Sequence, residues 1–357
     1  MNESRLTALL KKAAERGASD LHITAGTKPF IRVDNKLQRL QDEPVLMPED
    51  TEAIIFSVVD QEHAAILKIK GETDMAFGIK GFGRFRLNAY RQRGSYACAF
   101  RLMHPEIPDI ETLGLPAVLR DCCYKRDGLV LITGPTGTGK STTLAAMVQE
   151  INKNRAVHVI TLEDPIEYLH RHGESMIDQR EIGIDSETFG TALRAAMRED
   201  PDVIVIGEMR DRETISAALT AAETGHLIIT TLHTTSAASS VERIIDVFPP
   251  KERDEIRLQL SMVLKTAASQ RLIPRADGNG RVAAFEVMQG TPAIRNIIKD
   301  NRLIQLKSAI QTGTRDGMQT MDQALGKLVS EGIIKEEDAR EFMTDPAEPQ
   351  PKAVLKW

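Results

Sequence analysis

The segment from Gly134 to Ser141 has the residue types and spacing of a loop that binds phosphate groups. It reads Gly-Pro-Thr-Gly-Thr-Gly-Lys-Ser and follows the apolar run 129–133. Its glycines let successive backbone N–H groups turn toward the β- and γ-phosphates, and a helix beginning near Lys140 adds the positive end of its dipole. Lys140 supplies a cation for the phosphate oxygens and Ser141 a hydroxyl for Mg²⁺. The sequence therefore predicts an ATP site made by Gly134, Pro135, Thr136, Gly137, Thr138, Gly139, Lys140, Ser141 and Thr142.

A first acidic element follows the strand predicted at 157–162. It contains Glu163, Asp164 and Glu167, and Pro165 ends the strand. Ligands of doubly wound sheets bind at the carboxyl ends of the strands, so a carboxylate here can orient water or Mg²⁺. The alternative is a solvated charge at a strand end.

A second acidic element, Glu208, follows the apolar strand predicted at 203–207 and is expected at the same edge. It resembles the acid of a Walker B strand, which binds Mg²⁺ and its waters. Such strands usually have an aspartate just before the glutamate, and here that position is Gly207. The residues alone leave a solvated charge open for Glu208 too.

Two histidines, His226 and His233, flank the strand predicted at 226–232. Their separation is odd, which places them on opposite faces of an element with a period of two. Both are candidate catalytic residues, but both need not reach ATP, and one is expected to be structural. Taken alone, each fits a hydrogen-bonded structural histidine better than a catalytic one.

Several arginines are placed where they could reach a phosphate held between domains or subunits. Guanidinium groups match the charge spread over a transferring γ-phosphoryl group. A solvated basic face is the alternative. The candidates lie on two predicted strands of the first 105 residues and, at i, i+4, on the helix predicted at 188–199: Arg84, Arg86, Arg91, Arg93, Arg101, Arg194 and Arg198.

Composition narrows the class of protein. A chain of 357 residues suits two domains, and a net charge of −5 disfavours nucleic acid as a partner. The three cysteines, Cys98, Cys122 and Cys123, form no C-x-x-C pair, so we expect small buried side chains and no zinc cluster. The opening helix lacks the core of a signal peptide and no apolar run approaches 18 residues, which predicts a cytoplasmic protein.

The chain is predicted to be of the α/β class, with two domains. Residues 1–104 read as an antiparallel sheet with one helix, an α+β domain, and a proline-bearing linker spans 105–115. From 116 to 345, apolar strands alternate with helices, which favours a parallel sheet covered on both faces. Its strands are expected at 128–133, 157–162, 203–207 and 226–232, and its helices at 141–153, 188–199 and 211–223. Beyond about 250 the pattern is mostly helical (251–269, 292–299, 302–312 and 321–332), and the tail 346–357 is expected to fray.

Taken together, these motifs resemble the secretion ATPase (GspE/PulE) superfamily and, within it, the motors that retract type IV pili. The similarity runs from the stretch 17–22 to the stretch 317–320, nearly the whole chain. Residues 162–167 resemble the family's Asp box, 207–211 its Walker B region and 222–234 its His box. The resemblance implies a PAS-like N-terminal domain, a RecA-like P-loop ATPase domain and a ring of six.

The resemblance also implies roles for single residues. Glu163 corresponds to the general base that activates water, and Glu208 to the Walker B acid, with Gly207 the normal form in the family. Arg86 and Arg101 correspond to arginines that reach the phosphates from the first domain. Arg194 and Arg198 match a second arginine pair. The implied cofactors are ATP and Mg²⁺, and the implied partners are a homohexamer and an inner-membrane pilus platform protein (PilC-like), at the inner face of the cytoplasmic membrane.

One segment favours retraction over extension. It resembles the Ala-Ile-Arg-Asn-Leu-Ile segment that marks retraction motors, which need it for pulling rather than for hydrolysis. An amphipathic helix with its isoleucines packed inward is a compatible interpretation. Extension motors also have a four-cysteine zinc element, which this chain cannot build after Cys123. The residues of the segment are Ala293, Ile294, Arg295, Asn296, Ile297 and Ile298.

The resulting hypothesis is a motor that hydrolyses ATP to retract a type IV pilus, returning pilin to the inner membrane. Three alternatives stay open at this point. They are a small-molecule P-loop kinase, a nucleotide-gated scaffold that does not hydrolyse ATP, and a paralogue that acts as an accessory retraction motor or a type II secretion ATPase.

Overall fold

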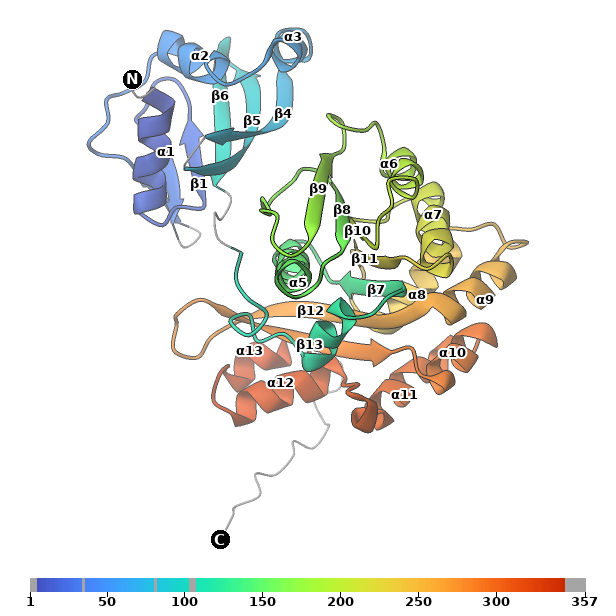
Figure 1. Ribbon diagram of the computed structural model, residues 1–357. Helices are drawn as coiled ribbons and strands as arrows, with labels where there is room; N and C mark the ends of the chain where they lie inside the picture. The colour runs from blue at the N-terminus through green and yellow to red at the C-terminus, as the bar shows by residue number, and fades with distance from the viewer. Residues whose placement is uncertain (1–4, 34–35, 80–81, 103–106, 344–357) are drawn as a thin grey trace. The chain divides into compact units, whose positions relative to one another are not determined.

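The computed structural model describes residues 5–33, 36–79, 82–102 and 107–343 (Figure 1). The chain forms two compact units, Met1–Glu106 with Pro165–Leu169, and Ile107–Asp164 with His170–Trp357. The predicted tail lies outside the described residues. Among the described helices, none is long and apolar enough to cross a membrane.

The first unit is built on a six-stranded sheet in the order β3-β2-β1-β6-β5-β4, and every neighbouring pair is antiparallel. The predicted α+β architecture is confirmed. The sequence pattern locates one of the expected helices, and the described residues form three, because α2 buries only Thr51, Ile54 and Ile55 and α3 only Leu67, which leaves little apolar periodicity to detect. The elements are α1 (Arg5–Glu15), β1 (Asp20–Ile23), β2 (Phe30–Val33), β3 (Lys36–Arg39), α2 (Pro48–Phe56), α3 (Gln61–Lys70), β4 (Glu72–Ile79), β5 (Gly83–Gln92) and β6 (Ser95–Leu102).

The second unit has a seven-stranded sheet in the order β13-β12-β7-β11-β10-β8-β9. All neighbours are parallel except the hairpin β12–β13. The predicted α/β class, with a mostly parallel sheet, is confirmed. The sheet and the helices up to α9 comprise α4 (Ala117–Cys123), β7 (Gly128–Thr133), α5 (Lys140–Asn154), β8 (His158–Glu163), β9 (Met176–Glu181), α6 (Phe189–Ala196), β10 (Val203–Ile206), α7 (Arg212–Glu223), β11 (Leu227–Leu232), α8 (Ala237–Asp246), α9 (Arg253–Val263), β12 (Leu264–Pro274) and β13 (Arg281–Gln289).

The register of the central strands gathers four loops at one edge of this sheet. Leu232 of β11 lies opposite Thr133 of β7, and Ile206 of β10 lies opposite Leu162 of β8. All residues of β7, β10 and β11 are buried, as expected of strands covered on both faces. The carboxyl ends of β7, β8, β10 and β11 therefore bring their following loops together.

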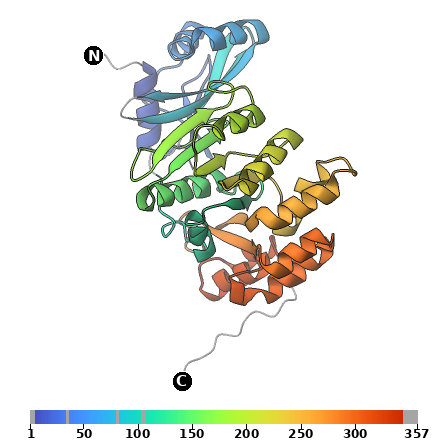
Figure 2. The same cartoon turned by 45° about the vertical axis from the view of Figure 1, so that its right-hand side comes forward.

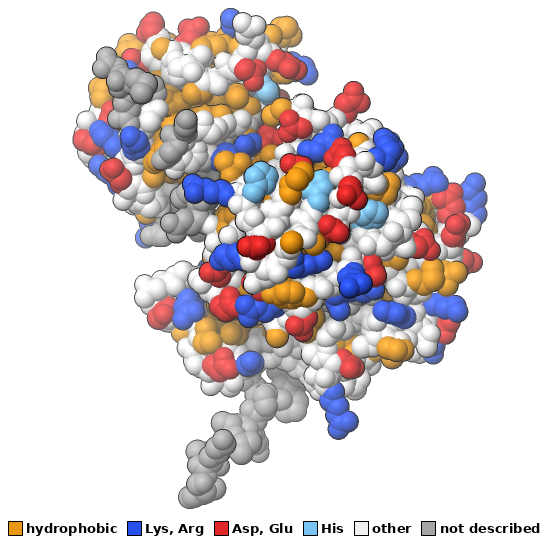
Figure 3. Space-filling view, viewed as in Figure 1, with side chains coloured by type: hydrophobic (Ala, Val, Ile, Leu, Met, Phe, Trp, Pro, Cys, Tyr) orange, Lys and Arg blue, Asp and Glu red, His pale blue; other side chains and the backbone are white. Residues whose placement is uncertain are grey.

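Helices cover both faces of the sheet (Figures 1 and 2). On one face, Val130 and Ile132 pack with α4 and α5. On the other, Leu129 and Leu131 pack with α6 to α9. In the space-filling view, acidic and basic side chains of the second unit are interspersed on the face shown (Figure 3).

The C-terminal part is less helical than predicted. The helix expected at 251–269 is wrong beyond Val263, where α9 ends and β12 begins. The extended backbone of Leu264 (ψ 117°) makes this change, and β12 then pairs with β7. The remaining elements are α10 (Pro292–Lys299), the 3₁₀ turn η1 (Leu303–Gln305), α11 (Leu306–Thr312), η2 (Thr314–Asp316), α12 (Met321–Ser330) and α13 (Glu336–Arg340).

The described part of the predicted linker, 107–115, packs with the second unit, where Ile110 is buried in the core beside α4 and α5. The three cysteines are free and buried, as predicted. Desolvation raises the pKa of each thiol.

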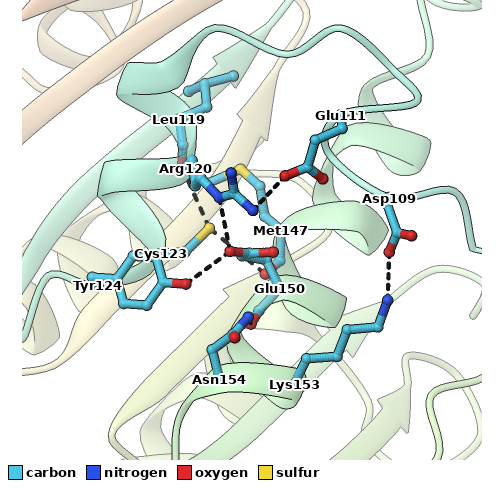
Figure 4. Close-up of polar contacts among 10 residues, drawn as sticks. All are labelled: Asp109, Glu111, Leu119, Arg120, Cys123, Tyr124, Met147, Glu150, Lys153 and Asn154. Carbon is cyan, nitrogen blue, oxygen red and sulfur yellow. Dashed lines mark hydrogen bonds and ion pairs between the residues drawn. The ribbon is translucent and has the colours of Figure 1, made fainter.

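A charged cluster joins this segment and α4 to the helix that follows the glycine loop (Figure 4). Glu150 of α5 is buried and accepts hydrogen bonds from Tyr124 Oη (2.8 Å) and Arg120 Nε (3.0 Å). Arg120 also pairs with Glu111. Burial acts to raise the pKa of Glu150, but these hydrogen bonds and the arginine charge outweigh it, so the pKa lies below its ordinary value of 4.5.

Glu150→Gln is therefore expected to lower the free energy of unfolding by about 1–2 kcal/mol at neutral pH, since a charged acceptor is lost. A depressed pKa stabilises the fold above the unfolded value, so the difference from wild type should shrink as the pH falls below 4.5. Denaturant unfolding at several pH values measures both effects. The control is Lys153→Gln on the same helix. The ion pair between Lys153 and Asp109 is about half exposed, so its loss should lower the free energy of unfolding by roughly 0.5 kcal/mol or less. Equal losses for the two variants would contradict the prediction.

Candidate nucleotide site

The loop between β7 and α5 requires glycine at two positions. Gly134 has a φ of 148°, and a Cβ there would lie 2.6 Å from the carbonyl oxygen of Gln270. Gly139 has a φ of 86° and forms the N-cap of α5. These glycines set the backbone path that leads into the helix, so the loop's amides and the helix dipole can face the same anion.

Lys140 is buried and lies within the loop. Its Nζ donates to the carbonyl oxygens of Gly134 (2.7 Å) and Pro135 (3.0 Å). Thr138 Oγ1 also donates to Pro135 O (2.9 Å). Ser141 follows Lys140 in the first turn of α5 and is exposed. The ammonium and the hydroxyl therefore lie at adjacent positions at the start of one helix.

Glu163 ends β8, and its orientation is set by two neighbours. Its Oε1 accepts hydrogen bonds from Thr161 Oγ1 (2.6 Å) and Gln179 Nε2 (3.0 Å). Gln179 belongs to β9, and its Oε1 accepts from the backbone N–H of His170 (2.8 Å). Gln179 could not be predicted from the sequence, because the strand that carries it, β9, mixes exposed and buried residues without clear alternation.

His170, which lies in the loop between β8 and β9, stays neutral. Its side chain is half-buried, and desolvation lowers its pKa to about 4. It is therefore uncharged at neutral pH, and its backbone N–H supports Gln179 beside Glu163.

Glu208 is held on both carboxylate oxygens. Arg210 Nε lies 2.7 Å from Oε1, and His233 Nε2 lies 3.1 Å from Oε2. Gly207, just before it, packs closely on the end of β8. A Cβ at this position would lie 3.3 Å from Leu162 O and 3.5 Å from the Cα of Glu163. An aspartate at position 207 would crowd the end of β8.

The structure separates the two candidate histidines. His233 follows β11 at its carboxyl end and contacts Glu208. His226 precedes β11 at the opposite end, where its Nδ1 lies 3.0 Å from the carbonyl oxygen of Ala221 in the last turn of α7. His226 is therefore not brought to the glycine loop of its own subunit.

Arg86 and Arg101, the two arginines of the first unit that the resemblance assigns to the phosphates, lie directly opposite one another on β5 and β6. Arg101 Nε donates to Asp20 Oδ1 (3.1 Å), and Arg86 Nε lies 3.8 Å from Asp74 Oδ1. Both arginine side chains are about half exposed or more. They form one exposed basic pair with an acidic side chain on each flank.

The remaining candidate arginines lie in different surroundings. Arg91 lies over the ring of Tyr96, and Arg93, at a φ of 47°, makes the turn between β5 and β6. Arg194 pairs with Glu213 of α7 beside a cavity of about 540 Å³ between α6 and α7. Arg198 lies beyond α6, which ends at Ala196 ahead of the Asp200–Pro201 turn, so the helix predicted to carry both Arg194 and Arg198 is too short to include Arg198.

The segment 293–298 forms α10, and its predicted inward face is confirmed: Ile294, Ile297 and Ile298 are buried. Thr291 caps the helix and Pro292 occupies its first position. Arg295 is half-buried, and its Nε is buried without a hydrogen-bond partner among the described residues. The helix packs chiefly on α9.

The donors at this edge suit a magnesium ion delivered with nucleotide. The hydroxyl of Ser141 and the carboxylate of Glu208 are hard oxygen ligands, which Mg²⁺ prefers. Within the described residues there is no cluster of three or more histidine, cysteine or acidic side chains that could hold a metal by itself. An ion here would therefore rely on phosphate oxygens and water for most of its ligands.

The known proteins that this chain resembles are secretion system and type IV pilus proteins. A family model described as type II/IV secretion system protein matches residues 2–312. The chain is 47% identical to the "Type IV pilus retractation ATPase PilT" of Pseudomonas aeruginosa, over 94% of this chain and 97% of that protein. It is 43% identical to a "Twitching motility protein" of Neisseria gonorrhoeae, over 94% and 89%. Among solved structures, the "Pilus Retraction Motor PilT and Bound ADP" superposes with a TM-score of 0.91 at 47% identity, covering 98% of this chain and 99% of that one.

Proposed function

Because the chain belongs to the type II/IV secretion system protein family, we propose that it is an ATPase whose hydrolysis of ATP powers retraction of a type IV pilus. The observation that supports this best is the meeting of Lys140, Glu163 and Glu208 at one edge of the sheet in a chain 47% identical to a pilus retraction ATPase. The similar solved motor, PilT, has bound ADP.

In the proposed reaction the loop and Lys140 bind the phosphates and neutralise charge on the γ-phosphoryl group. Glu163 accepts a proton from the attacking water, and Thr161 and Gln179 fix which way the carboxylate points. Ser141 and Glu208 would hold a magnesium ion bound with the nucleotide, and that ion would supply further positive charge for the phosphate oxygens. His233 and Arg210 orient Glu208.

The assembly and its partners are part of the same proposal. Arg86 and Arg101, and Arg194 with Arg198, are proposed to reach phosphates across domain or subunit boundaries in a homohexamer. Arg194 and Arg101 each have a carboxylate partner in the single chain, so a phosphate would have to compete with that partner. The motor is proposed to act in the cytoplasm at the inner face of the membrane, on a platform protein of the pilus machinery, with α10 required for pulling.

The experiment that tests this function is phosphate release from ATP by the purified chain with no added acceptor. Wild type is expected to turn over, and Glu163→Gln to reduce turnover about 100-fold while it still binds nucleotide, because only the proton acceptor is removed. Glu174→Gln, a change at an exposed residue of the loop between β8 and β9, is the control and should retain turnover. Full activity of Glu163→Gln would exclude this residue as the base, and no release by wild type would overturn the proposal.

A further inference from the structure

One carboxylate on strand β13 lies at the amino ends of two helices (β13, α8 and α12 are labelled in Figure 1). Glu286 Oε1 accepts a hydrogen bond of 2.7 Å from the backbone N–H of Ala237, the first residue of α8. The backbone amide of Met321, the first residue of α12, lies close enough to act on the pKa of Glu286. The first N–H groups of a helix have no acceptor within the helix and form the positive end of its dipole. Glu286 therefore accepts from the amino end of α8 and lies near that of α12.

The surroundings of Glu286 show that this arrangement is specific. The side chain is half-buried, and burial raises its pKa, whereas the backbone amides of Ala237 and Met321 act in the opposite direction. Asp322 raises the pKa further and Lys307 lowers it. A desolvated carboxylate is costly unless directed bonds hold it. Here the bond from the amide of Ala237 holds the carboxylate.

The helix that Glu286 holds follows directly on the nucleotide site. Only residues 233–236 connect the end of β11 to the start of α8. This short loop begins with His233, whose Nε2 lies 3.1 Å from Glu208 Oε2. Farther along, Thr234 Oγ1 bonds Ser240 Oγ (2.6 Å), which ties the loop to the first turn of α8. A shift of the amino end of α8 must therefore move His233.

We propose that Glu286 is a positioning residue for ATP hydrolysis, which fixes the amino end of α8 and thereby holds His233 against Glu208. The inference rests on the proposed function for its kinetic consequence. Its structural consequence, the position of His233, can be measured without turnover.

The test compares Glu286→Ala and Glu286→Gln in the full chain, with Glu242→Ala on the exposed face of α8 as the control. Alanine accepts no hydrogen bond, so kcat should fall about 10-fold while KM for ATP and the affinity for ADP change less than about 2-fold, because the phosphate loop is untouched. The amide oxygen of glutamine can accept, so Glu286→Gln should restore kcat to within about 3-fold of wild type. Glu242→Ala should match wild type.

A second measurement follows the imidazole resonance of His233 by NMR in histidine-labelled protein. The resonance should move in Glu286→Ala and return toward the wild-type position in Glu286→Gln. If wild type hydrolyses ATP but Glu286→Ala changes neither kcat nor this resonance, the inference is overturned. A loss of kcat matched by an equal loss of ADP affinity, with no rescue by glutamine, would also overturn it. If wild type fails to hydrolyse ATP but the resonance moves as expected, the proposed function falls and the positioning of His233 by Glu286 stands.

Discussion

Lys140→Ala is expected to reduce ATP turnover by about 1,000-fold or more, because it removes the only cation inside the described loop, 134–142. The ammonium donates to the carbonyl oxygens of Gly134 and Pro135, which places it within the ring of backbone that would surround the phosphates. Bound phosphate oxygens would compete with these carbonyls for the same three N–H donors. The phosphate released per minute by purified protein measures the effect, and binding of a fluorescent nucleotide reports the accompanying loss of affinity.

The matched control for this variant is Lys153→Ala on the same helix. Lys153 lies near the far end of α5 and pairs with Asp109, with about half of each side chain exposed. It lies more than three helical turns from the loop, so its removal should leave turnover within about 2-fold of wild type. Lys140→Ala with full turnover, or two variants equally impaired, would show that ATP is not hydrolysed at this loop.

The sequence could predict those parts of the site in which the local backbone or burial restricts the residue type at each position. The glycine loop is such a part, because the backbone at Gly134 and Gly139 excludes other residues. The strands β7, β10 and β11 are predictable too, since every residue in them is buried and the apolar run is unbroken. From these strands alone, Glu163 and Glu208 are expected at one edge, and the register places them there.

The parts that sequence could not predict depend on polar residues that are buried by tertiary contacts. Strand β12 buries Thr266, Ser269 and Gln270, so it does not read as a core strand and its first residues look like a continuation of α9. Gln179 was missed for a related reason, because β9 mixes exposed and buried positions. The partner of Glu286, the amide of Ala237, is 49 residues away along the chain and leaves no local signal.

The two histidines are separated by lying at opposite ends of β11, which is not the difference of face that the sequence predicts. Their odd spacing does not say which of them meets the acidic residues. The direction of β11 decides it, since ligands meet the carboxyl end of a parallel strand and only His233 lies there. Chain direction within the sheet follows from the right-handed β-α-β connections, which need several elements to be known at once.

Arg295→Ala is expected to leave ATP turnover within about 2-fold of wild type and to abolish pilus retraction in cells. The helix α10 should survive the change, because alanine is a strong helix former and Ile294, Ile297 and Ile298 keep their buried contacts. None of the residues proposed for hydrolysis belongs to α10. Arg295 is only half-buried, so part of its side chain is open to a partner outside its own fold. Twitching motility on a surface, measured beside phosphate release by purified protein, separates the two activities.

The control for this variant is Lys299→Ala, a change of similar charge one turn later on the same helix, at an exposed position. It should leave both turnover and motility close to wild type, because Lys299 caps the helix end by charge and does not share the position of Arg295. A parallel loss of turnover and motility in Arg295→Ala would mean that α10 supports the nucleotide site rather than the transfer of force. Retained motility would remove the segment 293–298 from the pulling mechanism. If one side chain is needed for movement but not for hydrolysis, the motor transmits force through a specific surface. If both activities are lost together, movement depends on the whole fold.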